Sequence, residues 1–571
     1  MSRTTLTIAL LLIGLATAST MGADWSPWVE AFLGILVVLL ILLSRDGLHA
    51  ESHRSPLFWF SMLLVVMLVV LPWSGEKYAS MRTFIYWFTG IGFFFTARTL
   101  DREFRQRVLF ILVCIAGLGG LWAIINFAAF SNIERAGGFL GNANALGGFA
   151  VLFLPLAIGM AVLRKGMQRW IAIFSAACLL IALALSFSLT GMVSLGVAAI
   201  IWLALQPRAI LLRCIRWALV GCIAVVLLSI GIRFAQTRSV TRAVRLDQVI
   251  TRSHFNSSFS QRWEFIRVSF AMAQAKPFTG VGIGAYQLSY SQFGESRLEQ
   301  PRYAHNAYLE LAAEGGIIVG LLGLLSFFAL GRAIVHSLRP PSAERGVLFA
   351  AAVGLLASGL HSVTDFAWHF PGVWLAFWSI AGLVVTQNAS PARASSRVIG
   401  WVVGLLACFI VIRGVGVAMA YTSLARAEKY LAEENYTSAI VNYRAGLRWD
   451  PDPALLAKLA NALWLARPGG ADSITVARVY GERALWLAPV SYATHIAVAR
   501  IAVAQKDDAR AEVHYQRAIE LDRHFHPDVT AEYVNFLRAR NQQQKADSLI
   551  AEAEQAYQSI LKPGEALFYK K

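Results

Sequence analysis

A histidine and an asparagine stand directly in front of a long apolar stretch in YAHNAYLELAAEGG, residues 303–316. Because the ordinary pKa of histidine lies near 6.5, His305 can accept or release a proton at neutral pH. Asn306 could orient its imidazole, and the glycines that follow would let a helix pack closely. We therefore predict that His305 is catalytic. The alternative is a histidine that only makes structural hydrogen bonds.

A basic stretch precedes this histidine. From residue 233 to residue 302 the chain holds ten arginine or lysine residues and only four acidic residues. Arginine suits phosphate oxygens because its planar guanidinium donates two parallel hydrogen bonds and stays charged. We expect arginines of this stretch to bind an anionic substrate. The alternative is a solvated basic surface, or one that contacts anionic lipid headgroups.

The segment SQRWEFIRVSFAMAQA, residues 260–275, places Trp263, Ile266 and Phe270 at three- and four-residue steps. Such spacing predicts an amphipathic helix that can lie on a membrane surface. Arg262 would then stand beside the apolar stripe, at the level of the lipid headgroups.

A second polar motif, ERAGGFLGNANALGG, begins at residue 134. Arg135 and Asn144 are candidate substrate-binding residues in it. Asparagine is also a good helix N-cap, so Asn142 or Asn144 could serve only to satisfy backbone amides.

A third motif is HSVTDFAWHFPG, residues 361–372, in which His361, Asp365 and His369 crowd a short turn. We regard these three side chains as accessory site residues. Helix capping and turn formation are the alternative explanation.

The sequence predicts no metal site and no cofactor. The five cysteines all lie in or beside apolar segments. The histidines show none of the spacings typical of metal ligands. The net charge of +17 comes mainly from short basic loops and gives no evidence of nucleic-acid binding.

The composition is that of a membrane protein, with 57% hydrophobic and 15% charged residues and a mean hydropathy of +0.55. Apolar blocks of about 18 to 23 residues are long enough for α-helices to cross a bilayer. We predict an all-α polytopic fold with about thirteen such helices. They lie near residues 6–22, 27–44, 56–73, 81–98, 108–130, 143–163, 170–189, 191–206, 215–234, 309–331, 346–363, 368–387 and 398–420. The first block could alternatively be a cleaved signal peptide.

Basic residues collect in alternate loops, as they do on the cytoplasmic side of membrane proteins. This pattern places the N-terminus in the cytoplasm. The three polar motifs, the long loop 235–308 and the C-terminal domain then all lie on the opposite side. The sequence thus divides into N-terminal transmembrane helices (1–130), a transmembrane core with the large loop (131–420) and a C-terminal domain (421–571).

The C-terminal domain contains repeats. Ala439, Ala477 and Ala511 occupy equivalent positions at spacings of 38 and 34 residues, and Pro451 and Pro489 end two of the units. The pattern resembles tetratricopeptide repeats, in which pairs of antiparallel helices stack into a solenoid. Such surfaces commonly bind a protein or peptide partner.

Taken together and in this order, RAGGFLGNANALGG, SQRWEFIRVSFAMAQAKPFTGVGIGAY, YAHNAYLELAAEGG and HSVTDFAWHFPG resemble motifs of the O-antigen ligase and polymerase superfamily. The resemblance spans roughly residues 100–390. It implies a metal-independent glycosyltransferase of the bacterial inner membrane, acting at the periplasmic face. The donor would be a glycan on undecaprenyl diphosphate, and the acceptor a lipid, glycan or protein.

The resemblance also implies roles for individual residues. His305 matches the histidine that assists the acceptor hydroxyl, and Arg262 matches an arginine that holds the diphosphate. Arg135 precedes the GNAN segment much as an arginine does in relatives. One departure concerns SLTGM, residues 188–192, where relatives often have Ser-Arg-Gly. A second phosphate contact must then come from Arg135, Arg302 or Arg252.

Several functions stay open at this point. The leading one is an O-antigen ligase or polymerase that acts in cell-surface polysaccharide biosynthesis. A protein O-oligosaccharyltransferase is a close alternative. A non-catalytic scaffold of a polysaccharide assembly complex would explain the missing arginine. A transporter is least favoured, since the clearest ionisable residue within a helix, Arg413, lies in the last predicted span.

Overall fold

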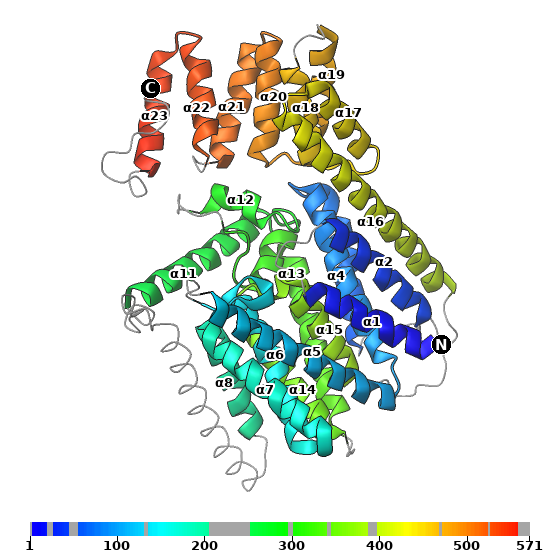
Figure 1. The fold of residues 1–571 in the computed structure, drawn as a ribbon. Helices are drawn as coiled ribbons and strands as arrows, with labels where there is room; N and C mark the ends of the chain where they lie inside the picture. The colour runs from blue at the N-terminus through cyan, green and yellow to red at the C-terminus, as the bar shows by residue number, and fades with distance from the viewer. Residues whose placement is uncertain are drawn as a thin grey trace.

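The computed structural model describes residues 3–19, 27–44, 55–130, 135–204, 252–294, 301–339, 344–385, 397–466, 471–522 and 526–557. Within these ranges every regular element is a helix and no strand occurs, which confirms the predicted all-α class. Figure 1 shows a bundle of long helices with a row of shorter helices above it.

The bundle contains helices from the first 385 residues. They are α1 (Arg3–Ser19), α2 (Pro27–Leu43), α3 (Pro56–Val70), η2 (Leu71–Trp73), α4 (Lys77–Arg98), α5 (Arg102–Ala129), η3 (Gly138–Leu140), α6 (Ala143–Leu163), α7 (Gly166–Ser186), α8 (Leu189–Ala204), α11 (Arg252–Ala275), α12 (Tyr286–Phe293), α13 (Ala307–Ser337), α14 (Arg345–His361), η4 (Ala367–His369) and α15 (Pro371–Val384).

The remaining helices form the C-terminal part. They are α16 (Arg397–Ala432), α17 (Tyr436–Leu447), α18 (Pro453–Leu465), α19 (Ala471–Leu487), α20 (Tyr492–Ala504), α21 (Asp508–Asp522), α22 (Pro527–Arg538) and α23 (Gln543–Tyr557).

Six segments of the described part are long and apolar enough to cross a membrane: Pro56–Trp73, Arg102–Ala129, Ala143–Leu163, Gly166–Ser186, Ala307–Ser337 and Cys408–Ala432. Shorter apolar helices accompany them in the bundle, among them Phe32–Leu43, Leu189–Ile201, Arg345–His361 and Pro371–Val384. The chain is therefore a multi-pass membrane protein. The helix predicted at 215–234 lies outside the described residues, so the total of about thirteen spans stays a prediction.

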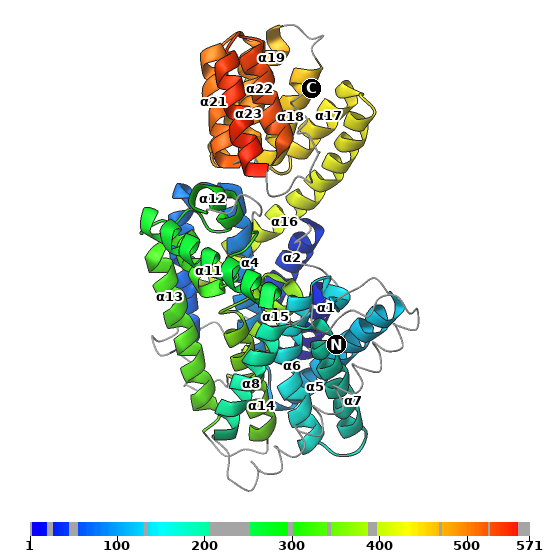
Figure 2. The same cartoon turned by 90° about the vertical axis from the view of Figure 1, so that its left-hand side faces the viewer.

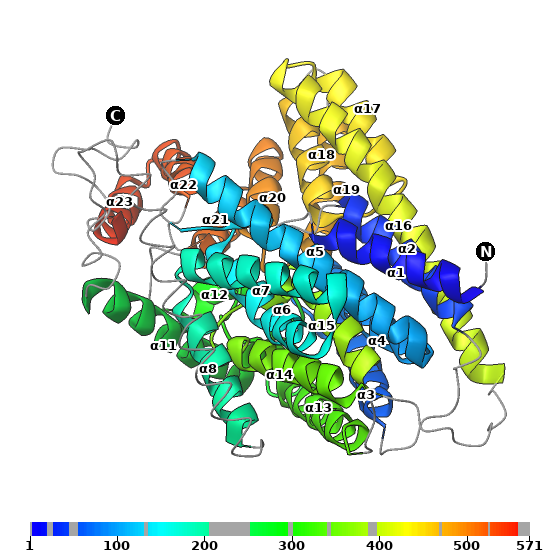
Figure 3. The same ribbon diagram turned by 60° about the horizontal axis from the view of Figure 1, so that its bottom comes forward.

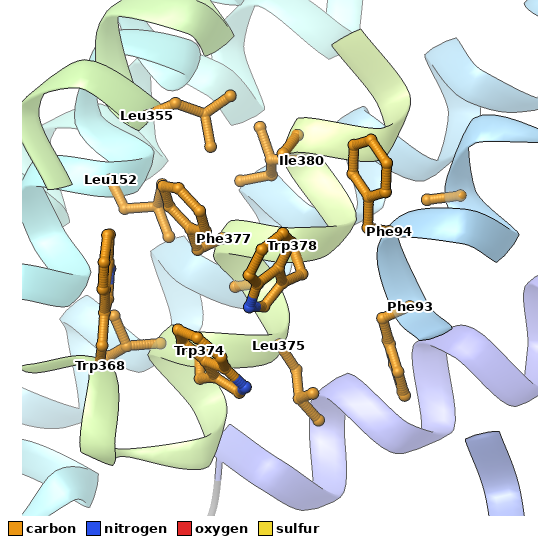
Figure 4. Packing of buried hydrophobic residues seen from close by; sticks show 14 of the residues in the cluster. Phe93, Phe94, Leu152, Leu355, Trp368, Trp374, Leu375, Phe377, Trp378 and Ile380 are labelled. Atoms are coloured by element: carbon orange, nitrogen blue, oxygen red, sulfur yellow. The ribbon is translucent and has the colours of Figure 1, made fainter. Parts of the chain in front are cut away.

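Aromatic side chains fill the centre of the bundle, between α4, α6, α14 and α15 (Figure 4). Trp378 is fully buried. Its ring packs edge-to-face on Phe60, 4.7 Å between centroids, and on Trp374 at 5.2 Å. Edge-to-face contacts suit the charge distribution of aromatic rings. This core fixes α15, and with it the turn that carries Asp365 and His369.

Helix α13 is kinked at Gly316, whose φ of 83° lies in the left-handed region. A Cβ atom there would lie 2.7 Å from the backbone carbon of Phe278, so glycine is required. The facing segment bonds into the kink: Ile317 N–H donates to the Pro277 carbonyl at 2.8 Å, and Gly282 N–H to the Glu314 carbonyl at 2.9 Å. These bonds attach the end of α11 to the start of α13.

Successive C-terminal helices pack against one another, for example α18 against α19 and α20 against α21. Ala439, Ala477 and Ala511 are all fully buried, so the small residues do lie where neighbouring helices meet. The first helix of the array is the end of α16, which runs without interruption across residue 420. The assignment to the tetratricopeptide family stays a prediction.

The repeat array is fixed to one end of the bundle, at the start of α4 (Figure 2). Asp450 forms an ion pair with Arg413 at 2.7 Å and accepts a hydrogen bond from the Tyr78 hydroxyl at 2.5 Å. Lys77 Nζ donates to the Trp486 carbonyl at 3.2 Å. The Ser291 hydroxyl, in α12, donates to the Leu521 carbonyl. The repeats therefore stand over the end of the bundle that carries the long loop.

Candidate functional site

The polar motifs meet at this same end of the bundle, although they are far apart in the sequence. Arg135 lies between α5 and α6, Arg262 lies in α11, His305 precedes α13, and Asp365 lies between α14 and α15. Together with Asn144 in α6, these residues are termed the polar cluster below.

Arg135 lies against the end of α7. Its Nε donates to the Ser186 carbonyl at 2.9 Å, and its Nη2 donates to Asn144 Oδ1 at 2.6 Å. Phe187 adopts a left-handed conformation, with φ of 49°, where the chain turns from α7 into α8. Arg135 is thus held beside the SLTGM segment.

The two asparagines of the GNAN segment, Asn142 and Asn144, make different contacts. Asn142 is the N-cap of α6, because its side-chain oxygen accepts from the N–H groups of Asn144 and Ala145 at 2.9 and 3.0 Å. The side chain of Asn144 is therefore available to orient Arg135. The capping alternative holds for Asn142, whereas Asn144 belongs to the polar cluster.

Asp365 lies between Arg135 and Arg262, which are termed the arginine pair. It is fully buried, and its Oδ2 lies 3.8 Å from Arg262 Nη2. Arg262 Nε also donates to the Thr364 carbonyl at 3.1 Å. Burial raises the pKa of Asp365 to about 6, although the Phe366 N–H, both arginines and Asn144 favour the charged form.

His305 lies next to the arginine pair in a left-handed backbone conformation, with φ of 53°. Its ring stacks on Phe265 at 5.3 Å and meets the edge of Phe366 at 4.5 Å, measured between centroids. Burial, together with the nearby Arg262 and His369, lowers the pKa of His305 to about 3. The imidazole is therefore neutral at physiological pH, and in the empty site it is a weak proton acceptor. Its Nδ1 has no hydrogen-bond partner within the described part of the chain.

Asn306 positions His305 through the backbone. Its side-chain oxygen accepts from the N–H groups of Tyr308 and Leu309 at 3.1 and 3.0 Å, so it caps α13. Ala307 N–H donates to the Ser362 carbonyl at 3.0 Å. These bonds connect the His-Asn motif to the turn that bears Asp365.

The contact between Glu310 and His369 was not evident in the sequence. Glu310 Oε1 lies 2.8 Å from His369 Nε2, and Glu310 Oε2 accepts from the Ala304 N–H at 2.7 Å. Tyr303 stacks on the His369 ring with 3.7 Å between centroids. The available signal was an acidic residue in an otherwise apolar helix, which usually marks a functional or structural site.

His361 connects to the SLTGM segment. The Thr190 hydroxyl lies 3.3 Å from His361 Nε2, and the hydroxyl of Ser188 lies 3.3 Å from that of Thr190. His361 is fully buried. Its contacts make it a support of the α7–α8 turn, close to Arg135.

Two predicted arginines, Arg302 and Arg252, are not among the residues of the polar cluster. Arg302 is exposed, and its guanidinium carbon lies 5.5 Å from the centre of the Tyr303 ring. Arg252 is the first residue of α11, and its side chain lies outside the described part. In the ranges that the structure describes, no group of three or more His, Cys, Asp or Glu residues is arranged to hold a metal ion.

Such a cluster combines fixed cationic donors, a neutral imidazole and a protonatable carboxyl group. The donors can stabilise negative charge on a phosphate, since they are already held in place. The imidazole can accept a proton from a hydroxyl group.

Residues 174–327 of the chain match the protein family Wzy_C, described as O-Antigen ligase. The match indicates a membrane protein of the glycan ligase or polymerase type. It includes Arg262, His305 and the SLTGM segment, whereas Arg135, Asn144 and Asp365 lie on either side of it. Among curated proteins, none matches the chain.

Proposed function

Because residues 174–327 form an O-antigen ligase family domain, we propose that the chain is a glycosyltransferase that uses a glycan linked to undecaprenyl diphosphate. The reaction takes place at the periplasmic face of the bacterial inner membrane, with the N-terminus in the cytoplasm and the repeats in the periplasm. The observation that carries this proposal is the arginine pair beside the neutral imidazole of His305.

The reaction is a displacement at the anomeric carbon of the donor. The acceptor oxygen forms a bond to that carbon, while the bond from the carbon to the diphosphate oxygen breaks and its electron pair leaves with undecaprenyl diphosphate. The acceptor proton moves to His305. A direct displacement of this kind inverts the anomeric configuration.

Arg262 and Arg135 bind the departing diphosphate. Fixed donors of this kind contribute roughly 10²–10³ in rate when their charge develops in the transition state. Arg135 supplies the second cationic contact at the position where SLTGM has none, because Asn144 and the Ser186 carbonyl hold its guanidinium beside that segment.

Donor binding strengthens His305 as a base. In the empty site, burial and the charge of Arg262 both hold its pKa down. A diphosphate bound to Arg262 would offset that positive charge, so the imidazole would accept a proton more readily. The acceptor would thus be activated only when the donor is in place.

The acceptor is a lipid, another glycan or a protein. The repeat array stands over the same end of the bundle as the polar cluster, through contacts such as Ser291 with Leu521. This position favours an acceptor or partner protein that is recruited by the repeats, as in a protein O-oligosaccharyltransferase.

One observation favours a second candidate, a non-catalytic scaffold of a polysaccharide assembly complex. The SLTGM segment lacks an arginine that relatives often carry. A scaffold would retain the fold and the repeats without turning over donor.

The test is turnover of a purified undecaprenyl-diphosphate oligosaccharide by the full-length protein, with lipid products separated by chain length. His305→Ala should lower turnover roughly 10²–10⁴-fold, the usual contribution of a general base. His336→Ala is the matched control, since His336 is exposed near the far end of α13. Arg262→Ala should also lose turnover. Its control is Arg169→Ala, at an exposed position in α7.

The products separate the alternatives. Longer lipid-linked glycans made without any added acceptor indicate a polymerase. Donor consumption that begins only when a lipid or protein acceptor is added indicates a ligase or a protein transferase. An intact donor with every acceptor supports the scaffold.

A further inference from the structure

A cavity of about 650 Å³ lies at the end of the bundle opposite the repeats. It is formed by the start of α5, the connection between α6 and α7, and the residue before α14. Figure 3, in which the lower end of the bundle comes forward, shows α5, α6, α7 and α14 in this region. Helix α4 runs from the repeats toward this end over 22 residues. At a rise of 1.5 Å per residue, the cavity therefore lies roughly 30 Å from the end of the bundle that carries the polar cluster.

The polar wall of the cavity has donors without acceptors. Arg164 Nη2 donates to Gln106 Oε1. In the described ranges, however, Arg164 Nε and Gln106 Nε2 have no hydrogen-bond partner, although both atoms are buried. Buried N–H groups are nearly always satisfied in folded proteins, so these two donors are available to an acceptor atom of a molecule in the cavity.

The charge around this wall is positive. Arg102 pairs with Glu344 at 2.7 Å, and Arg107 pairs with Glu103. These pairs leave Arg164 without an acidic partner among the lining residues. Further basic residues at this end are Lys165, Arg169 and Arg345, all of which are exposed. An anionic acceptor is therefore favoured over a neutral one.

The inner wall of the cavity is apolar. Phe110 and Ile111 line it from α5, eight and nine residues after Arg102. At a rise of 1.5 Å per residue they lie roughly 12 Å further along the helix. Both residues belong to the apolar segment Arg102–Ala129, which is long enough to cross the membrane. The cavity thus has a basic mouth at the helix ends and an apolar interior toward the hydrocarbon core.

We propose that this cavity binds an anionic glycerophospholipid, with the lipid phosphate on Arg164 and Gln106 and an acyl chain along Phe110 and Ile111. Basic pockets between transmembrane helices bind the headgroups of such lipids in the same manner. The phosphate oxygens would satisfy both buried donors, and the acyl chain would cover the apolar wall. The site is separate from the polar cluster and does not depend on its chemistry.

The experiment measures lipid retained by the full-length protein after exchange into vesicles of phosphatidylglycerol and phosphatidylcholine in equal amounts, followed by native mass spectrometry. The wild type should retain phosphatidylglycerol selectively. Arg164→Gln should lower that selectivity roughly tenfold or more, as expected for the loss of a charge-assisted hydrogen bond. Gln106→Leu, which leaves the net charge unchanged, should lower it as well.

Arg169→Gln is the matched control, since it removes one positive charge next to the cavity from a residue that does not line it. It should retain phosphatidylglycerol as the wild type does. Equal losses in Arg169→Gln and Arg164→Gln would overturn the proposal, because they would indicate only a diffuse surface charge. Complete displacement of the lipid by millimolar inorganic phosphate would also overturn it, in favour of a soluble anion. Size-exclusion elution of each variant checks that it is folded.

Discussion

Replacing Asp365 by asparagine should abolish a pH dependence of donor binding that the wild type shows. Asp365 is fully buried between the arginine pair, and burial raises its pKa to about 6. A diphosphate donor requires the same arginines and brings negative charge close to the carboxylate. The donor should therefore bind better to the protonated form of Asp365.

The size of the effect follows from Coulomb's law. One phosphate charge about 6 Å from the carboxylate, at an effective dielectric constant of about 20, costs about 2.8 kcal/mol, or about two pKa units. The pKa of Asp365 would then rise from about 6 in the empty site to about 8 with donor bound. Binding would take up close to one proton at pH 7.

The sign of the pH effect is fixed by this shift. The bound form holds the proton more tightly, so donor affinity should rise as the pH falls through the interval between the two pKa values. The total gain should be about 100-fold between pH 9 and pH 5, most of it between pH 8 and pH 6. A sugar diphosphate ester keeps two charges throughout this range, so the linked proton must belong to the protein.

The assay is titration calorimetry with a short-chain polyprenyl diphosphate sugar, in two buffers of different ionisation enthalpy. Wild-type protein should take up a proton, whereas Asp365→Asn should bind with similar affinity at every pH and take up none. Proton uptake that persists in Asp365→Asn would refute this reasoning and indicate another group, such as His305, instead. Absence of donor binding at any pH would count against the proposed function itself.

Three further predictions concern the frame of the site. Gly316→Ala should lower the melting temperature of the protein, since φ of 83° is unfavourable for alanine and its Cβ would lie 2.7 Å from a backbone carbon. Strain of this kind costs of order 1–3 kcal/mol. Gly331→Ala, in open space on the same helix, is the control and should leave the melting temperature unchanged. Asp450→Asn should detach the repeats from the bundle, because loss of one partner from a buried ion pair costs about 3–5 kcal/mol. Limited proteolysis should then cut the chain faster between the bundle and the repeats. An unchanged cleavage rate would mean that the other contacts are enough to hold the repeats on the bundle. Arg135→Gln should lower kcat/KM roughly 10²-fold, and Leu189→Arg added to it should restore part of the activity, while a double variant no better than the single one would contradict the role given to Arg135.

Much of the fold could be predicted from the sequence. Apolar blocks of membrane-spanning length and small residues at repeat intervals both reflect local pattern, and the structure has helices at both. The amphipathic spacing around Trp263 likewise predicts α11, in which Trp263 is exposed and Phe265 is buried. The motifs also indicated the candidate His305 and Arg262, because proton transfer and phosphate binding need these residue types.

The contacts between motifs could not be predicted, since they depend on how distant helices pack. Glu314 is an example: its carboxylate accepts from the N–H groups of Gly284 and Tyr286 at 2.8 and 3.0 Å, and so holds a loop some thirty residues away in the sequence. Glu310 is another, because its contact with His369 needs α13 and the α14–α15 turn to meet. The sequence shows only two acidic residues in an apolar helix.

The SLTGM departure shows why tertiary contacts matter for judging activity. From the sequence, a missing arginine between Ser188 and Gly191 suggests a weakened or absent site. In the structure, a cation is nevertheless present beside that segment, because the end of α7 turns left-handed at Phe187 and accepts Arg135 from the preceding connection. The attraction between a phosphate group and a cation depends on the distance between the charges and not on which segment of the chain carries the cation. The departure is thus compatible with a functional diphosphate site, and it weakens the scaffold as an explanation for this chain.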